Sequence, residues 1–270
     1  KLNSKTTWGN WMFAGHWNRI INPKLFSETS LSFTRYRLKE KQKISGSSST
    51  NLGDKFIASV DDFSIMNKWN YNPQSWLKLN FGINSSYLRH TPFNYENDES
   101  LENYEIIRVH SFRNAMFLDT KIKPFDKMTL NIGTRAVNYY SEGFTDNSLE
   151  PRISLNYNIT KNLIFNTSYM KVKQNSHLLF TTGNFASNEV WIPATKKIKP
   201  AISEQVSSGF IANFLNNQWI MELTGYYKTM NHLATYKSGE INLKGDPNWI
   251  SKIETNGTGI SYGLEFFVKK

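Results

Sequence analysis

The chain has 270 residues, no cysteine and a formal net charge of +10. The lack of cysteine excludes thiol catalysis, disulfides and cysteine-rich zinc sites. The mean hydropathy of −0.51, without any run of about 20 apolar residues, excludes a bundle of membrane helices but allows either a soluble protein or a membrane β-barrel.

Period-two alternation of apolar and polar residues recurs along the chain and predicts β-strands rather than helices. In the segment 76–88, for example, one face carries Leu77, Leu79, Phe81 and Ile83. About eleven strands of this kind are expected. They lie near residues 6–17, 26–37, 55–70, 76–88, 108–122, 128–140, 150–159, 163–172, 202–214, 219–231 and 254–268.

The connections between these strands alternate between short and long. Short turns containing Asn, Pro or Asp are predicted at 22–24, 72–75, 124–127, 160–162 and 215–218. Long polar loops are predicted at 39–54, 89–107, 141–149, 173–201 and 232–253. Most strands exceed the common soluble length of about 5–6 residues and suit tilted membrane strands of about 9–11 residues, with short turns on one side of the bilayer.

Aromatic residues gather near both ends of the predicted strands. Those beside the short turns are Trp17, Trp69, Tyr71, Trp76 and Trp219, and those at the opposite ends are Tyr87, Tyr139, Tyr140 and Tyr169. Such belts are typical of the two interfaces of a bilayer. One strand changes phase, because Phe56 and Val60 alternate out of step with Phe63. A bulge near Asp61 and Asp62 is therefore expected.

A basic stripe follows the second strand with period two and consists of Arg35, Arg37, Lys39, Lys41 and Lys43. It continues the face of Leu31 and Phe33. If that face meets lipid, the stripe reaches the outer surface and predicts contact with lipopolysaccharide phosphates through charge-assisted hydrogen bonds, for which Arg35, Arg37 and Lys39 are the candidates. The alternatives are a solvated loop base and a lumenal face that attracts an anionic substrate. Because the remaining Lys and Arg residues are scattered, no nucleic-acid partner is expected.

The motifs that suggest chemistry are weak. Gly259 to Gly263 matches a Gly-x-Ser-x-Gly nucleophile elbow, but an alternating strand follows it and no histidine follows Ser261. The five histidines lack zinc spacing, so no metal site is predicted. The acidic segment Asn94 to Glu105 could hold calcium through carboxylate oxygens or form a solvated outer loop, although EF-hand spacing is absent. No catalytic residues and no cofactor are expected.

Four motifs between Glu150 and Glu265 resemble the barrel strands of TonB-dependent outer-membrane receptors of the Bacteroidetes type. The first is Glu150-Pro151-Arg152 leading to Tyr157, and the second is Lys199-Pro200-Ala201, where the family usually has Glu in place of Ala. Leu223 to Lys228 resembles a strand with paired tyrosines. Asn256 to Glu265 resembles the Asn-x-Gly-x-x-x-x-Gly-x-Glu strand. All four occur in the family's order and spacing.

The resemblance implies an all-β, antiparallel up-and-down meander that forms part of a transmembrane barrel of about 22 strands, located in the outer membrane and plugged by a separate domain. Residues 1–270 are then expected to be a barrel-wall fragment that lacks the plug domain and the C-terminal strands. The implied function is TonB-coupled uptake of a nutrient, such as a glycan, peptide, siderophore or heme. The partners that the resemblance implies are the plug and TonB, and it allows a surface lipoprotein as a further partner. Membrane lipid and lipopolysaccharide are expected from the lipid-facing strands and the basic stripe.

Ligand contacts are expected from the aromatic residues of the long loops, since such rings can stack on sugars or heme. The candidates are Phe93, Tyr95, Phe180, Phe185, Trp191, Tyr236 and Trp249. Two other classes of protein stay open on the sequence alone. One is a soluble all-β binding module or hydrolase, whose apolar faces would meet in a core. The other is a barrel porin or adhesin without energy coupling.

Overall fold

The computed structural model describes residues 2–45, 51–97, 106–182, 187–214, 218–240 and 246–270. Eleven strands form a single antiparallel sheet in the order β1-β2-β3-β4-β5-β6-β7-β8-β11-β12-β13. Their bounds are β1 Leu2–Asn22, β2 Leu25–Ser45, β3 Asn51–Gln74, β4 Leu77–Asn97, β5 Val109–Phe125, β6 Met128–Ser141, β7 Phe144–Asn158, β8 Leu163–Gln174, β11 Ala201–Phe214, β12 Trp219–Tyr236 and β13 Ile253–Lys269. This up-and-down meander confirms the predicted fold class and the eleven predicted strands.

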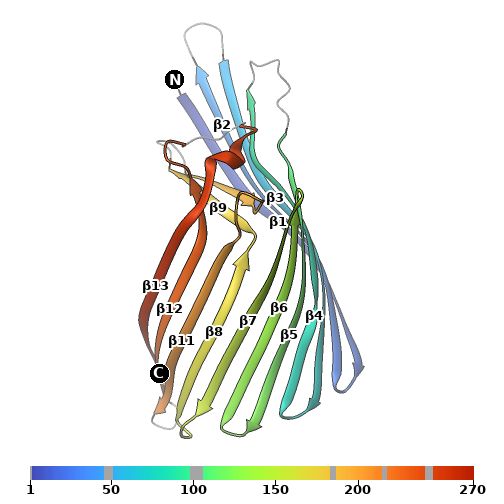
Figure 1. The fold of residues 1–270 in the computed structure, drawn as a ribbon, viewed down its shortest axis with the longest axis vertical. Coiled ribbons are helices and arrows are strands. Elements are labelled where there is room, and N and C mark those ends of the chain that lie inside the picture. The colour runs from blue at the N-terminus through green and yellow to red at the C-terminus, as the bar shows by residue number, and fades with distance from the viewer. Residues whose placement is uncertain (1, 46–50, 98–105, 183–186, 215–217, 241–245) are drawn as a thin grey trace.

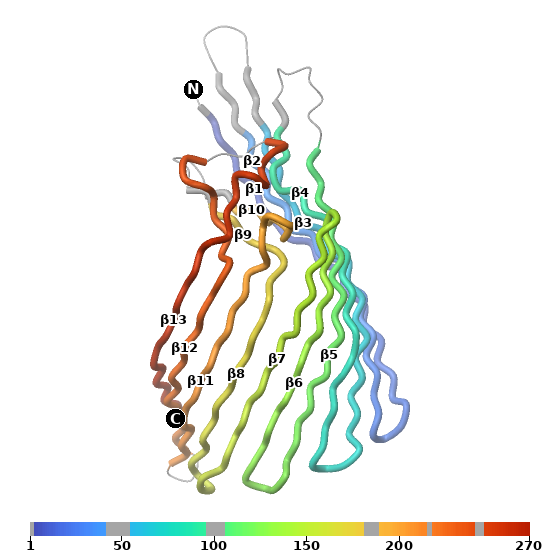
Figure 2. Tube along the Cα trace, in the orientation of Figure 1, coloured from blue at the N-terminus to red at the C-terminus, as the bar shows by residue number. Residues whose placement is uncertain are grey.

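The sheet is a curved, open wall of tilted strands (Figure 1). The short turns lie together at one end of this wall, and the longer connections lie at the other end, hereafter the loop end (Figure 2). Within the described ranges, β1 pairs with β2 alone and β13 pairs with β12 alone, so the barrel is partial. Among the described residues, no helix is long and apolar enough to cross a membrane.

One face of the sheet, hereafter the apolar face, carries large apolar side chains that stay exposed. Leu31, Phe63 and Met116 have 58%, 46% and 69% of their surface exposed, respectively. The strand register aligns such residues in rows, one of which runs Phe33, Phe63, Tyr87, Phe112 and Tyr140 across β2 to β6. Neighbouring rings in this row are 4.5, 6.2 and 5.1 Å apart between Phe33 and Phe112.

The opposite face, hereafter the polar face, is built from hydroxyl, amide and charged side chains. The next row along the strands contains Ser32, Ser64, Ser86 and Arg113. Ser64 Oγ and Ser86 Oγ are 2.8 Å apart, and Asn131 Nδ2 donates to Ser154 Oγ at 2.9 Å. The two faces differ because successive side chains of a strand point to opposite sides, which turns the period-two sequence pattern into two chemically distinct surfaces.

A hairpin of β9 (Ser176–Thr182) and β10 (Ser187–Pro193) lies inside the region predicted to be a long loop at 173–201. It crosses the polar face near the loop end, where β10 contacts β3 and β4 while β9 contacts β12 (Figure 1). The short 3₁₀ helix η1 (Trp249–Lys252) packs beside it. Together they bury an apolar cluster against the wall that consists of Leu38, Phe56, Ala58, Phe93, Val109, Leu179, Val190, Ile192, Ile198, Trp249 and Ile253.

This apolar cluster explains the change of phase in β3. The pairing of β2 with β3 is continuous through Asp61 and Asp62, so the predicted bulge at that place is wrong. The register with β4 shifts instead between Ile57 and Ser59. Phe56 and Ala58 are apolar residues on the polar face, and they are buried there because the hairpin covers them.

Two further expectations need correction. The predicted long loop at 141–149 is a tight turn at Glu142 and Gly143, whose φ angles are 46° and 79°, and β7 starts at once at Phe144. Two successive residues with positive φ give the twist that a two-residue hairpin requires. Tyr139 lies on the polar face and is 1% exposed, so it does not belong to the outer aromatic belt, whereas Tyr87 and Tyr140 lie on the apolar face.

Candidate functional sites at the loop end

The segment between β10 and β11 is fixed to the wall by hydrogen bonds from several strands. Tyr139 Oη of β6 donates to the Ala194 carbonyl at 3.1 Å. His177 Nε2 lies 2.9 Å from the Lys199 carbonyl, and His232 Nδ1 of β12 lies 3.2 Å from the Pro200 carbonyl. Because a carbonyl oxygen can only accept, both imidazole nitrogens act as donors. The base of the hairpin is therefore held by side chains from strands on both sides of it, Tyr139 of β6 and His232 of β12.

Two histidines near this base, His90 and His177, are buried. His90 is 0% exposed, and its Nε2 lies 3.2 Å from Ser176 Oγ at the start of β9. Burial lowers the pKa of His177 below its ordinary value; the nearby His232 acts in the same direction, and the hydrogen bond to the Lys199 carbonyl partly opposes them. His177 is thus held in its neutral form, which costs less to bury than the charged imidazolium.

The structure places the predicted ligand-contact residues in different environments. Phe93 and Trp249 are 2% and 1% exposed and pack on each other with ring centroids 5.5 Å apart. Tyr236 packs against the same apolar cluster. Tyr95 and Trp191 are half-buried. Phe180 of β9 is 60% exposed, and Phe185 lies outside the described residues. The ligand contacts of this set remain a prediction, and Phe180 presents the most accessible ring of those described.

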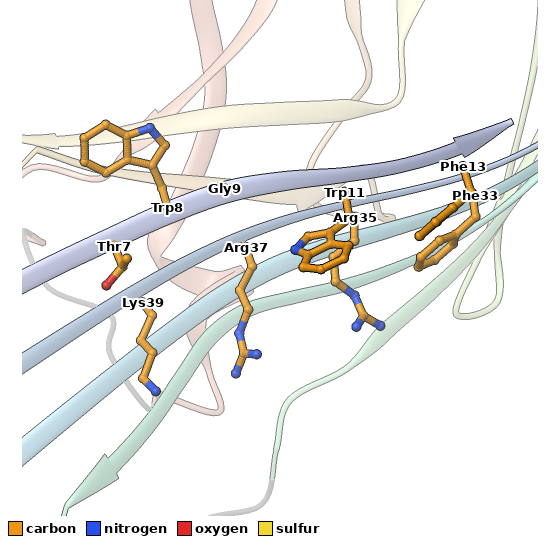
Figure 3. A pocket seen from close by; sticks show the side chains of 9 residues that line it. All are labelled: Thr7, Trp8, Gly9, Trp11, Phe13, Phe33, Arg35, Arg37 and Lys39. Atoms are coloured by element: carbon orange, nitrogen blue, oxygen red, sulfur yellow. The ribbon is translucent and has the colours of Figure 1, made fainter.

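Arg35, Arg37 and Lys39 of the basic stripe lie on the apolar face at the loop end, at the border of its aromatic row. Arg35 pairs with Trp11 and Asp61, and Arg37 pairs with Gly9 and Ser59. With Lys39, these residues line a shallow groove, hereafter the basic groove, whose other lining residues are Thr7, Trp8, Gly9, Trp11, Phe13 and Phe33. The side chains of Arg35, Arg37 and Lys39 extend to the same side as Trp11 and Phe13, whereas Trp8 points to the other side (Figure 3).

An ion cluster that the sequence analysis missed lies beside this groove. Asp61 Oδ1 accepts from Arg35 Nε at 2.5 Å, and Asp61 Oδ2 accepts from Arg35 Nη2 at 3.2 Å and from Arg89 Nε at 3.0 Å. A further contact joins Arg89 Nη2 to Asp61 Oδ2. The Asp61 side chain is 4% exposed, while those of Arg35 and Arg89 are 41% and 37% exposed. The three residues are far apart in the sequence, and only the strand register brings Arg35, Asp61 and Arg89 into one row.

The described residues contain no group of three or more histidine, aspartate or glutamate side chains arranged to hold a metal ion. The side chains of residues 96–105, which form most of the predicted acidic loop, lie outside the described part, so the calcium alternative has no structural test. Ser261 lies in the middle of the extended strand β13, opposite Lys228 of β12, and not on a strand-to-helix turn.

Comparison with known proteins identifies a family. A family model described as TonB dependent receptor-like, beta-barrel matches residues 2–269. Comparison with curated proteins gives no match.

Solved structures share the fold at low identity. The yersiniabactin uptake receptor FyuA of Yersinia pestis has a TM-score of 0.62 at 10% identity, covering 98% of this chain and 40% of FyuA. The RagAB peptide importer has a TM-score of 0.60 at 11% identity, covering 99% of this chain and 34% of the importer chain. The siderophore receptor PirA of Pseudomonas aeruginosa has a TM-score of 0.57 at 11% identity, covering 96% of this chain and 53% of PirA. The chain thus spans about half or less of these receptors.

Proposed function

The chain belongs to the TonB-dependent receptor-like β-barrel family of outer-membrane transport receptors, and we propose that it forms part of the wall of a receptor that takes up a nutrient by coupling to TonB. Its place is the outer membrane of a Gram-negative bacterium. The observation that carries the proposal is the single-layered sheet with an exposed apolar face and a hydrogen-bonded polar face. Such a sheet suits lipid on one side and a polar lumen on the other.

In this proposal the loop end faces the outside of the cell, because barrels of this class keep their short turns on the periplasmic side. The β9–β10 hairpin then lies within the outer mouth of the lumen, where it narrows the path of an incoming ligand. The exposed ring of Phe180 and the half-buried ring of Trp191 lie on this hairpin. We expect these two side chains to contact the ligand, whose candidate classes are glycans, peptides, siderophores and heme.

For Phe93 and Trp249 we propose a packing role, because their near-complete burial in the apolar cluster keeps the hairpin and η1 against the wall. The remaining parts of the mechanism belong to partners: a plug that closes the lumen, TonB that supplies energy, and a surface lipoprotein that assists capture. Uptake of this kind needs no bond chemistry in the wall, so we propose no catalytic residue and no cofactor.

The test uses cells in which the full receptor containing this chain is deleted and then restored. Growth is measured with ferric siderophores, heme, peptides or glycans as the limiting nutrient, in the presence and absence of TonB. We expect one nutrient class to require both the receptor and TonB. Uptake that needs the receptor but not TonB would favour an uncoupled porin. A full receptor that is monodisperse without detergent would favour a soluble all-β protein.

A further inference from the structure

The basic groove on the apolar face is the feature that the uptake function does not use. The polar face serves the lumen, whereas Arg35, Arg37 and Arg89 lie on the side that carries Phe33, Phe63 and Tyr87. We propose that this groove binds a phosphate group of an outer-leaflet glycolipid of the lipopolysaccharide class. The proposal rests on the membrane placement given above, and it does not depend on which nutrient is transported.

The position of the cations relative to the aromatic row supports a lipid headgroup. Arg35 is two residues beyond Phe33 on β2, and Arg89 is two residues beyond Tyr87 on β4. With a rise of about 3.3 Å per residue, the cations lie roughly 7 Å beyond the rings, toward the loop end. Aromatic side chains mark the level of the bilayer interface. Cations just beyond this level meet the phosphates of the outer leaflet.

The ion cluster prepares the arginines for an anion. Asp61 contacts Nε and Nη2 of both Arg35 and Arg89, so one acidic side chain orients two guanidinium groups. These contacts leave Nη1 of each arginine for an incoming oxygen, and the three side chains together keep a charge of +1. Arg37, two residues further along the same face of β2, adds a second positive charge. The planar guanidinium group of Arg37 can donate two parallel hydrogen bonds to phosphate oxygens, and Nη1 of Arg35 and of Arg89 can each donate to a further oxygen.

Apart from Thr7, the rest of the groove is lined by apolar residues and Gly9, which a solvated loop base would not require. Trp11 and Phe13 are 65% and 62% exposed, and with Phe33 they lie on the same side as the cations (Figure 3). The guanidinium carbon of Arg35 lies 5.6 Å from the centroid of the Phe33 ring. An acyl chain can follow these rings while the attached phosphate meets the arginines. The combination points to a phosphorylated lipid rather than to a free anion.

The test is a binding titration of the full receptor in detergent or nanodiscs with phosphorylated lipid A, dephosphorylated lipid A and inorganic phosphate. We expect the double variant Arg35→Gln/Arg37→Gln to bind phosphorylated lipid A at least about tenfold more weakly than the parent protein. The matched control Lys78→Gln/Lys121→Gln also removes two charges, from a cross-strand pair near the short turns on the polar face. We expect this control to bind as the parent does.

Three results would overturn the proposal. Equal binding of phosphorylated and dephosphorylated lipid A would leave an apolar surface without a phosphate site. Equal binding of inorganic phosphate would leave an anion site without lipid. If the double variant bound phosphorylated lipid A as tightly as the parent protein does, Arg35 and Arg37 would not be part of the binding site. Because Arg35 supports Asp61, the single variant Arg37→Gln, which leaves the ion cluster intact, is measured as well, and we expect roughly threefold weaker binding. Nutrient uptake by the same variants tests the transport function separately.

Discussion

Asp61 joins two cations on an exposed face of the wall, and its own carboxylate is almost fully covered. Removing an acceptor that holds two charged donors leaves both donors without their partner, and the remaining like charges repel. The cost is moderated by solvent, because the two arginine side chains are more than one third exposed. The effect of this carboxylate on stability should therefore be measurable but modest.

We expect Asp61→Ala to lower the stability of the full receptor by about 1–2 kcal/mol. Samples are heated to a series of temperatures and then run on a gel without boiling, and the measurement is the temperature at which the compact migration of the folded barrel is lost. Asp126→Asn, in an exposed short turn, is the control and should leave this temperature unchanged. A variant at Asp61 that melts with the parent protein would show that the cluster contributes no net stability.

Because His177 is buried in the docked hairpin, we expect the docking of the β9–β10 hairpin to depend on pH. Burial lowers the pKa of its imidazole in the docked hairpin, whereas the undocked side chain takes up a proton near the ordinary value of about 6.5. The contribution of His177 to docking is therefore fully present above about pH 6.5 and is lost as the pH falls below this value toward the lowered pKa. Hydrogen exchange of the β9 and β10 amides, corrected for intrinsic rates, should become faster at pH 5.5 than at pH 7.5.

In the variant His177→Asn, the side chain keeps a donor for the Lys199 carbonyl but no longer titrates. The difference in exchange between the two pH values should then be smaller than in the parent protein. An unchanged difference would assign the pH dependence to other groups of the hairpin base.

At the scale of elements, the β9–β10 hairpin is held by packing as well as by hydrogen bonds. Ile192 of β10 is 0% exposed and lies in the apolar cluster. Truncating a fully buried isoleucine removes contacts and leaves a cavity, which costs about 2–5 kcal/mol. The loss falls on the docking of the hairpin, because the sheet itself keeps its backbone ladder.

We expect Ile192→Ala to increase proteolytic cleavage within the hairpin while the barrel stays folded. Phe180→Ala, in the same hairpin but 60% exposed, is the matched control and should be cleaved at the parental rate. Equal protection of both variants would mean that the hairpin is held without its apolar contacts.

The elements of the wall could be predicted from the sequence because its two environments impose period two on every strand. The β9–β10 hairpin was not predicted. It covers one end of the wall, where apolar residues such as Phe56 and Ala58 lie on an otherwise polar face. In the sequence, this change of phase looks like a bulge. The turn at Glu142 was missed because Glu is an unusual residue at positive φ. The basic stripe was visible in the sequence, but its link to Asp61 and Arg89 needs the cross-strand register.

At the scale of the whole molecule, the decisive property is that consecutive residues of one strand lie in different media. Val206 of β11 is on the apolar face and 50% exposed, and Gln205 is on the polar face opposite Met170 and Lys228. Because the chain has no cysteine, a spin label can be attached at each position of a single-cysteine series. Oxygen concentrates in hydrocarbon, whereas a nickel chelate stays in water, so the two relaxing agents report the medium of each label.

We expect a label at Val206→Cys in reconstituted full receptor to be accessible to oxygen and protected from the nickel chelate. A label at Gln205→Cys should lack this high oxygen accessibility, and the series from Ser203 to Ser208 should oscillate with a period of two residues. In a soluble all-β protein, exposed positions such as Val206 would instead be reached by the nickel chelate. Lipid on the apolar face also predicts that Val206→Lys lowers barrel stability, by up to about 2–4 kcal/mol at the bilayer midplane and by less nearer an interface.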